Sequence, residues 1–426
     1  MSFARWRSDR LVAMKRDILS LDRRGFIGLG AGAVGAWAVG GCTVTRKYPG
    51  WHEGELDIHF IHTGVGEQTF FIFPDGTTML LDCGDTHHAK YMADVPPQPS
   101  ADRLGGEWTG RYIRRLTAKR EIDYVLVSHW HGDHVGDPAL GCRTAADGRK
   151  ICGITSVAED FQFRRYLDHQ YPNAGQYALD PDPAAFAMMQ DWIPRAQRET
   201  GMQVEPFRVG AYDQIVLTHN PRQYGNFEVR NIAANAVLWD GANGTIDCGR
   251  IHVKAGGGEK IYENRLSAVI RIRYGQFAYY SGGDAELTLR GEDGKDYNWE
   301  ERIGQTVGPV HVCKTNHHAG KTGMSAGFVK AVRPRIYLSS VWQADMVNDA
   351  SLANMTSREL YPGDRLICFG YISDKVKTVA AKYAADLMPS GHAVVKVAPG
   401  GGVYTLFVLD AHDESMRILG ERSFVC

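Results

Sequence analysis

The stretch "VSHWHGDHVGD", residues 127–137, carries three histidines and one aspartate within six positions. It continues the apolar run "YVLV", which is typical of a buried strand. Imidazole and carboxylate groups are common ligands of zinc and related metals. The end of this strand is therefore predicted to form half of a metal centre, with His129, His131, Asp133 and His134 as ligands.

The spacing within the stretch suggests two ions. His129 and His131 are two positions apart on an extended segment, so their side chains point the same way and can reach one ion. Gly132 turns the chain, and Asp133 and His134 can then serve a second ion roughly 3.5–4 Å away. The alternative is a solvated loop with incidental histidines, which so dense a group of ligand types disfavours.

Composition describes an ordinary globular protein. Of 426 residues, 44% are hydrophobic and 23% are charged, which allows a large core. Residues 1–41 hold seven basic and three acidic side chains, so the remainder has a net charge of −5. A protein that binds nucleic acid non-specifically is normally basic, and we find no strong nucleic-acid signal here.

Residues 1–41 are predicted to be an export signal. In "LDRRGFIG", Arg23 and Arg24 resemble the core of a twin-arginine signal, and "VGGC" resembles a lipoprotein processing site with Cys42 as the lipidated residue. The glycine-rich stretch between them would make a poor membrane span. The alternative is a short helix of the mature protein. We expect an exported periplasmic or cell-surface protein, lipid-anchored to the membrane through Cys42 and a tether over residues 42–54.

Seven further cysteines form no CxxC pair, which argues against a zinc ribbon. Cys142 and Cys152 flank a turn-rich loop, and a disulfide between them would fit an oxidising compartment. A twin-arginine substrate, however, folds in the reducing cytoplasm before export. The sequence leaves this pairing open.

Alternation of apolar residues and turn residues predicts strands on both sides of an irregular middle. Residues 138–260 are read as an insertion or lid over the site, and residues 413–426 as a C-terminal tail. Strands are expected over residues 56–64, 68–76, 77–85, 122–129, 267–275, 276–284 and 335–341. Helices are expected over residues 106–121, 325–332 and 374–387, and a hairpin over residues 392–410.

Four motifs occur in the order typical of the metallo-β-lactamase fold. "SHWHGDH" matches the HxHxDH motif, and "LLDCGD" resembles an early strand end whose aspartate, Asp82, is usually structural. "YYSGGD" resembles the strand end that supplies a bridging carboxylate, here Asp284, and "KTNHHAG" resembles the late histidine motif with His317 and His318. The resemblance implies an α/β protein, a four-layer αβ/βα sandwich, over residues 55–412.

Within that superfamily, three segments resemble the ComEC-type hydrolase branch. They are residues 56–85, residues 263–284 with Asn264 and Ser267 in place, and residues 313–323. Because adjacent histidines point apart, one of His317 and His318 would ligate metal while the other donates to the substrate or supports a ligand. Lys321 could steady an anionic substrate or be an ordinary exposed lysine. The resemblance implies metal ligation by His129, His131, Asp133, His134, Asp284, His317 and His318, with catalytic roles for Asp133 and His318.

The chain also departs from the family pattern. Most members place a lone histidine between HxHxDH and the bridging aspartate, and here His169, His219 and His252 are candidates without a recognisable context. The ComEC-type branch shares this gap. A further histidine of that branch is missing from residues 339–352, where Asn348 or Asp349 stands nearby. Whether the site holds one ion or two is left open.

These observations predict a metal-dependent hydrolase that uses a metal-bound hydroxide on a phosphodiester or related ester. Two zinc ions are expected, and manganese or iron suits the same ligands. One alternative is a β-lactam or lactone hydrolase of the same fold. Another is a degenerate binding lipoprotein without turnover. The sequence identifies neither the substrate nor the oligomeric state.

Overall fold

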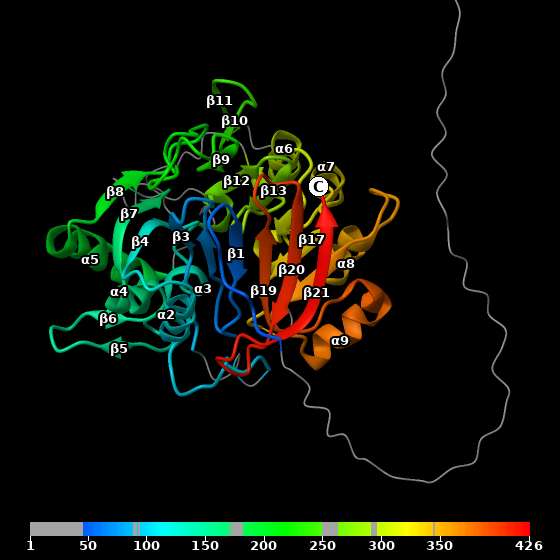
Figure 1. The fold of residues 1–426 in the computed structure, drawn as a ribbon. Coiled ribbons are helices and arrows are strands. Elements are labelled where there is room, and N and C mark those ends of the chain that lie inside the picture. Colours follow the sequence, from blue (N-terminus) through cyan, green and yellow to red (C-terminus); the bar gives the residue numbers. More distant parts are fainter. Residues whose placement is uncertain are drawn as a thin grey trace, which may run out of the picture. The chain divides into compact units, whose positions relative to one another are not determined.

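Two large β-sheets organise the chain (Figure 1). The computed structural model describes residues 46–87, 92, 94–169, 171, 182–248, 263–290, 296–343 and 346–426. Residues 45–426 form one compact unit. The predicted export signal and Cys42 lie outside the described residues. Among the helices that are described, none is both long and apolar enough to cross a bilayer.

The first sheet contains nine strands. The C-terminal strands form one edge of this sheet, and strands from the first half of the chain form the other edge. Their spatial order is β21 (Ile418–Val425), β20 (Val403–Leu409), β19 (His392–Val397), β1 (Leu56–Phe60), β2 (Thr69–Ile72), β3 (Thr78–Leu81), β4 (Glu121–Leu126), β7 (Gln162–Asp168) and β8 (Gln203–Pro206).

The second sheet contains eight strands. Their order is β11 (Thr245–Asp247), β10 (Val237–Trp239), β9 (Phe227–Ala234), β12 (Val269–Tyr274), β13 (Phe277–Ser281), β16 (Val312–Lys314), β17 (Ile336–Ser339) and β18 (Leu366–Phe369). Two short ribbons lie outside the sheets: β5 (Arg143–Thr144) with β6 (Lys150–Ile151), and β14 (Thr288–Arg290) with β15 (Asp296–Asn298).

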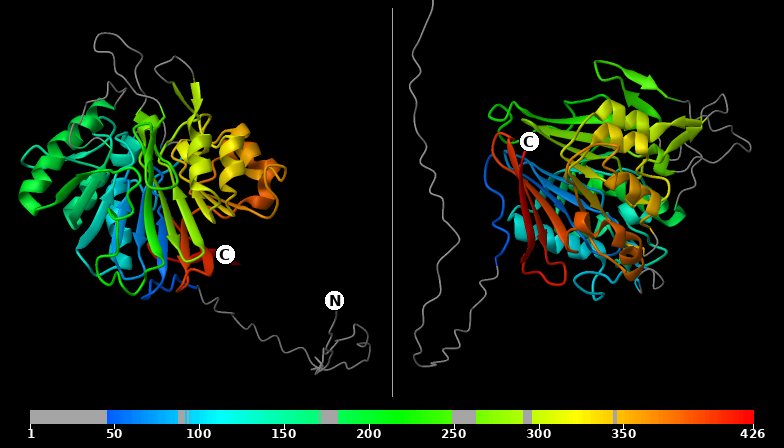
Figure 2. Two further views of the ribbon diagram at one scale, coloured as in Figure 1. Left: turned by 90° about the horizontal axis from the view of Figure 1, so that it is seen from above. Right: turned by 90° about the vertical axis from the view of Figure 1, so that its right-hand side faces the viewer.

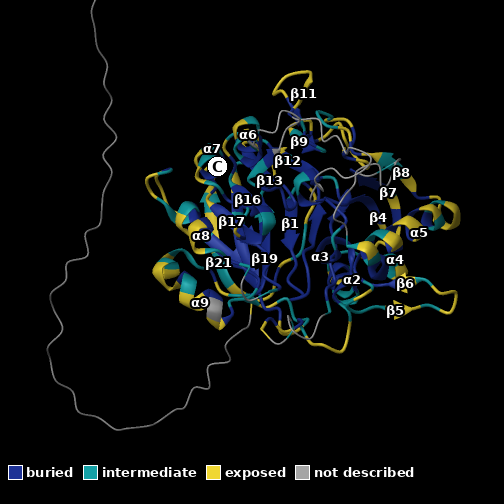
Figure 3. Ribbon diagram, turned by 180° about the vertical axis from the view of Figure 1, so that it is seen from behind, coloured by how far each residue is buried: buried dark blue, intermediate teal, exposed yellow. Residues whose placement is uncertain are grey.

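Helices cover the outer face of each sheet, and an apolar layer joins the inner faces (Figure 2). Strand β4 shows why: Tyr124 and Leu126 join the core between the sheets, whereas Val125 packs with the helices of the first sheet. Both faces of the central strands are therefore buried, and exposed residues gather on helices and loops (Figure 3). The predicted four-layer αβ/βα sandwich is confirmed.

The helices divide by sheet. On the first sheet lie α2 (Gly105–Leu116), α4 (Ile154–Asp160) and α5 (Pro183–Thr200). On the second lie α6 (Trp299–Val307), α7 (Ala326–Val332), α8 (Asp349–Thr356) and α9 (Asp374–Ala380), which continues as η3 (Ala381–Asp386). The short α3 (Gly132–Val135), η1 (Glu263–Leu266) and η2 (Asn316–Ala319) stand at strand ends near the site.

Two segments differ from the sequence interpretation. The described part of residues 138–260 is not an insertion, because it supplies β7 and β8 to the first sheet and β9, β10 and β11 to the second. Residues 413–426 are not a free tail, because they contain the edge strand β21. The hairpin over residues 392–410 is confirmed as the antiparallel pair β19–β20. Cys142 and Cys152 are free thiols in this structure.

Candidate metal centre

The predicted site residues follow parallel strands that end at one edge. Strands β3 and β4 are parallel in the first sheet, and β13 and β16 are parallel in the second. Asp82 follows β3, the HxHxDH segment follows β4, Asp284 follows β13, and His317 and His318 follow β16. Because the two sheets face each other, four strand ends deliver their polar side chains to one place.

Glycines allow the loops to approach one another. A Cβ atom on Gly84 would lie 1.8 Å from the carbonyl oxygen of Asp133. Gly283 has a φ of +52°, and a Cβ there would meet the Cβ of Ser128 at 2.7 Å. A larger residue at Gly84 would push the loop after β3 away from the HxHxDH loop, and one at Gly283 would push the HxHxDH segment away from the loop that carries Asp284.

Four side chains converge on a common point. His318 Nε2 lies 3.1 Å from both Asp133 Oδ2 and Asp284 Oδ2. His134 Nε2 lies 3.3 Å from Asp284 Oδ1 and 3.7 Å from Asp133 Oδ2. All four residues are buried. Glu67 belongs to the same neighbourhood, since ligand atoms of Glu67, His134, Asp284 and His318 all lie within 4.8 Å of one another.

A carboxylate faces Nδ1 of each central histidine, as a hydrogen-bond partner at His134 and at ion-pair distance at His318. Asp82 Oδ2 lies 2.9 Å from His134 Nδ1, and its carboxylate also accepts bonds from the amide and hydroxyl of Ser128 at 2.7 Å each. Glu67 Oε2 lies 3.2 Å from His318 Nδ1. A histidine whose Nδ1 faces a carboxylate presents Nε2 as a metal ligand.

His129 and His131 stand beside this group. His129 is fully buried, and its Nδ1 faces the hydroxyl oxygens of Ser128 at 3.0 Å and Ser267 at 3.4 Å. Its Nε2 is buried without a hydrogen-bond partner. The ring centroid of His129 lies 4.8 Å from that of His131 and 4.1 Å from that of His134. An unpaired buried nitrogen among other imidazoles fits a metal ligand.

The electrostatics favour a cation at this position. Burial alone would lower the pKa of His134, but Asp284, Asp133 and Asp82 hold it well above its usual value. Burial would raise the pKa of Asp284, yet His318, His134 and Lys314 hold it well below its usual range. Opposed by burial, the same histidines lower the pKa of Asp133 to about 2. A divalent cation can replace the protons that these carboxylates attract.

The two adjacent histidines differ in place. His318 is fully buried within the converging group. His317 has a side chain that is 29% exposed, with Nε2 at 3.2 Å from Asn264 Nδ2 and at 3.9 Å from Asp284 Oδ2. Its Nδ1 contacts Thr322 Oγ1 at 2.5 Å. The geometry thus puts His318 among the metal-facing side chains and His317 at the rim.

The remaining candidates do not join the group. His169 is engaged through both nitrogens, with Asn235 Oδ1 and Glu263 Oε1 at 2.8 Å each. His219 contacts Lys119 Nζ at 3.0 Å, near residues that precede β4 rather than follow it. Asn348 caps α8, Asp349 pairs with Lys382, and Lys321 is exposed. His252 lies outside the described residues.

Sequence reasoning missed two charged residues, Glu67 and Lys314. Glu67 stands in the glycine-rich loop between β1 and β2, and Lys314 is the last residue of β16. Lys314 is fully buried, with Nζ at 2.6 Å from the carbonyl oxygen of Gly283 and at 2.9 Å from Glu67 Oε1. The available signal was a lysine at the end of an otherwise apolar strand directly before "TNHH".

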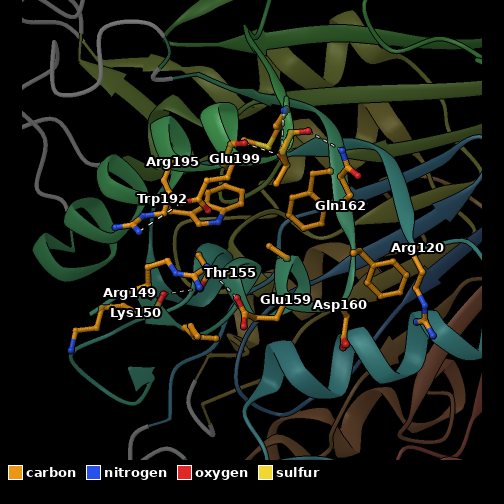
Figure 4. A pocket seen from close by; sticks show the side chains of 17 residues that line it. Arg120, Arg149, Lys150, Thr155, Glu159, Asp160, Gln162, Trp192, Arg195 and Glu199 are labelled. Carbon is orange, nitrogen blue, oxygen red and sulfur yellow. Dashed lines mark hydrogen bonds and ion pairs between the residues drawn. The ribbon is translucent and has the colours of Figure 1, made fainter. Parts of the chain in front are cut away.

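A separate pocket of about 500 Å³ lies between α4 and α5 (Figure 4). Its apolar floor includes Phe163 and Trp192, and Arg149 and Arg195 share Asp147 at its rim. The pocket is also lined by Gln162, the first residue of β7, whereas the residues of the metal centre follow the last residues of their strands. No residue of the predicted metal centre lines this pocket.

The family model of the metallo-beta-lactamase superfamily matches residues 62–145 of this chain. That segment contains Asp82 and the whole HxHxDH motif. The match supports membership of this superfamily. It covers the part of the chain in which the first half of the site is built. No curated protein matches the chain significantly.

Several solved structures resemble the chain at low identity. The diiron beta-hydroxylase CmlA from Streptomyces venezuelae is 12% identical, with 82% of this chain and 55% of that chain covered and a TM-score of 0.39. The metallo-beta-lactamase SMB-1 is 12% identical, with coverages of 77% and 91% and a TM-score of 0.29. Human tRNase Z, short form, is 14% identical, with coverages of 66% and 91% and a TM-score of 0.29.

This chain thus spans about half the length of CmlA.

Proposed function

We propose that this protein is a metal-dependent hydrolase with two zinc ions. The observation that carries the proposal is the convergence of His134 and His318 Nε2 on the carboxylates of Asp133 and Asp284 within a buried site. Two carboxylates buried this close together are costly unless their charges are paired, and a cation would pair with both of them.

The chain offers two positions for ions. Asp133, His134, Asp284 and His318 would hold one ion, which their mutual distances of 3.1–3.7 Å support. His129 and His131 would hold the other beside Asp284, and the unpaired Nε2 of His129 fits that role. Nitrogen and oxygen ligands of this kind suit zinc, and they also suit manganese or iron.

Bound ions would generate a nucleophile from water at neutral pH and polarise the bond to be cleaved. Asp133, kept ionised by a pKa of about 2, can accept a hydrogen bond from the attacking water and so orient it. His317 stands at the rim with its side chain 29% exposed, where it can hydrogen-bond to the substrate. In this proposal His318 acts as a ligand and His317 faces the substrate.

The proposed substrate is a phosphodiester or a related ester. It is supported by the segments that resemble the ComEC-type branch, namely residues 56–85, 263–284 and 313–323. Export and lipid anchoring through Cys42 would place the reaction outside the cytoplasm, and this location is part of the proposal. Lactam hydrolysis is less favoured, because enzymes of that kind usually complete a metal site with a lone histidine between HxHxDH and the bridging aspartate. His169 is a candidate for that position, but both of its ring nitrogens contact other residues, Asn235 and Glu263.

The proposal is tested by assaying purified protein, supplied with zinc, on bis(p-nitrophenyl) phosphate and on nitrocefin. We expect phosphodiester cleavage, and loss of it in the variants His131→Ala and Asp133→Asn. His219→Ala is the matched control, because this histidine lies away from the centre. Full activity of His131→Ala would exclude the mechanism, and activity on nitrocefin alone would exclude the substrate class.

A further inference from the structure

Lys314 is a buried cation directly behind the converging ligands. Its side chain has no exposed surface, and Nζ contacts three oxygens. They are the carbonyl oxygen of Gly283 at 2.6 Å, Glu67 Oε1 at 2.9 Å and Asp284 Oδ1 at 3.3 Å. An ammonium group has three donors, so these contacts use its whole capacity.

Glu67 faces Lys314 with one carboxylate oxygen and His318 with the other. Oε1 contacts Lys314, and Oε2 contacts His318 Nδ1 at 3.2 Å. Its backbone is fixed to the HxHxDH loop, because its amide donates to the carbonyl of Asp133 at 2.9 Å and its carbonyl accepts from Gly84 at 3.0 Å. The backbone of Glu67 and its Oε1 atom are therefore fixed, and Oε2 lies at ion-pair distance from His318.

By distance alone, Glu67 could be a metal ligand, since its carboxylate lies within 4.8 Å of ligand atoms of His134, Asp284 and His318. Its contacts argue otherwise. One oxygen is held by an ammonium group, and a metal ion bound to the same oxygen would be repelled by that charge. The other oxygen faces the nitrogen of His318 that points away from Asp133 and Asp284.

The charges explain why a lysine is needed here. Glu67, Asp82, Asp133 and Asp284 are four buried carboxylates around one centre. Asp82 is satisfied by Ser128 and His134, and Asp133 and Asp284 face the metal position. Without Lys314, Glu67 would be a buried carboxylate lacking its strongest partner, free to turn toward the ions.

We propose that Glu67 and Lys314 are a positioning pair for the metal centre. Lys314 keeps Glu67 out of the coordination shell, and Glu67 holds His318 so that Nε2 is presented to the ion. Asp82 does the same for His134 without a lysine. This inference rests on the proposed metal centre, and its test separates the two.

The test uses the full-length protein loaded with Co²⁺, whose visible absorption bands report the set of ligands. Binding strength is measured by chelator competition, and stoichiometry by elemental analysis. The variants are Glu67→Gln, Lys314→Met and the double variant, with His318→Ala as the variant that loses a ligand and His219→Ala as the control. Far-UV circular dichroism checks that each variant is folded.

We expect Glu67→Gln to weaken Co²⁺ binding roughly 10–100-fold, the usual loss for a group that orients a ligand, with bands and stoichiometry unchanged at saturation. Lys314→Met should shift the bands, because the released Glu67 becomes a ligand. The double variant should return to the wild-type bands. Since the double variant buries no unpaired charge, it carries the test if Lys314→Met does not fold.

The inference is overturned if Glu67→Gln changes bands and stoichiometry as His318→Ala does, because Glu67 would then be a ligand. It is equally overturned if affinity and bands stay unchanged in all three variants. Failure of the wild-type protein to bind Co²⁺ at all would overturn the metal centre itself and the pair with it.

Discussion

In the described part of the protein, buried histidines gather in two groups, and one of these has the character of a metal centre. The other, called here the β1–β19 histidine cluster, consists of His59, His62 and His392 with Tyr48, Asp57 and Tyr112. His59 Nδ1 lies 3.1 Å from the hydroxyl of Tyr112, and His392 Nδ1 accepts the amide of His62 at 3.0 Å. Its partners are mostly neutral.

Unpaired nitrogens do not distinguish the two groups, because Nε2 is buried without a hydrogen-bond partner in His59 and His62 as well as in His129. Carboxylates do. The β1–β19 histidine cluster has Asp57 alone, which Lys396 contacts at 3.0 Å and to which Tyr48 donates. Within the described residues, three or more ligand groups within 4.8 Å of one another occur at the metal centre alone.

The pKa values express the same contrast. Burial, with little to oppose it, lowers the pKa of His62 and of His392 to about 3, so both are neutral. Burial acts on His134 too, but three carboxylates raise its pKa well above the usual value. Local negative charge, rather than the number of histidines, makes a cation site.

The largest expected effect comes from replacing one histidine in each group. His318→Ala should lower metal affinity by more than the roughly 10–100-fold loss seen for groups outside the coordination shell, and activity should fall with it. His392→Ala should keep its metal and lose about 1–3 kcal/mol of stability, because the amide of His62 loses its acceptor. Metal analysis and urea unfolding check both. If His392→Ala lost its metal and His318→Ala kept it, the metal would be bound at the β1–β19 histidine cluster instead.

The contrast also predicts how stability depends on pH. Unfolded histidine has a pKa of 6.5, whereas His62 and His392 take up protons in the folded state only near pH 3. The unfolded chain therefore binds more protons below pH 6.5, and the free energy of unfolding falls as the pH is lowered. The expected slope is up to about 1.4 kcal/mol per pH unit for each histidine.

Urea unfolding between pH 6.5 and pH 5 measures this slope, and His392→Gln is the comparison variant. Both proteins contain His134 and the other buried histidines, so the difference between their slopes reports on His392. We expect the variant to have a clearly smaller slope. Equal slopes would mean that His392 is not held neutral by burial.

A third change breaks the charge pair of the β1–β19 histidine cluster. Asp57→Ala should cost about 3 kcal/mol, the lower end for breaking a buried pair, because Lys396 keeps Glu55 as a second partner. Metal content should not change. Thermal or urea unfolding with metal analysis tests this, and Asp57→Asn, which keeps an acceptor for Tyr48, should cost less. Loss of metal in either variant would link the two groups.

The smallest effect is expected at the pocket between α4 and α5. Arg195→Ala removes an ion pair with Asp147 at 3.2 Å, in which the two side chains are 26% and 45% exposed. Exposed pairs of this kind contribute about 0–1 kcal/mol. Stability should change by no more than that, with metal content and activity unchanged. A large fall in activity would show that this pocket matters to the reaction.

Sequence patterns predict those parts of the molecule that depend on near neighbours. The spacing of His129, His131, Asp133 and His134 follows from one strand end, and alternating apolar residues predict most strands of the two sheets. Glu67 and Lys314 meet only because the loop after β1 and the end of β16 face each other across two sheets. No local pattern contains that contact.

The strands in the middle of the chain, β7 to β11, are not predicted from the sequence for a related reason. Strand β9 carries Asn231 in its buried centre, where its side chain donates to the carbonyl of Arg208 at 2.9 Å and to Gln214 at 2.8 Å. A polar residue in that position resembles a loop in the sequence. The two acceptors of its side-chain amide, on Arg208 and Gln214, become visible only in the fold.

The metal content of purified residues 43–426, measured beside Asp284→Ala and Asp57→Ala, tests the central claim most directly. Both variants remove one buried carboxylate next to buried histidines, but from different groups. We predict two ions per chain, a sharp fall of the metal content in Asp284→Ala, and no change in Asp57→Ala. One ion or none, unchanged by Asp284→Ala, would contradict this prediction.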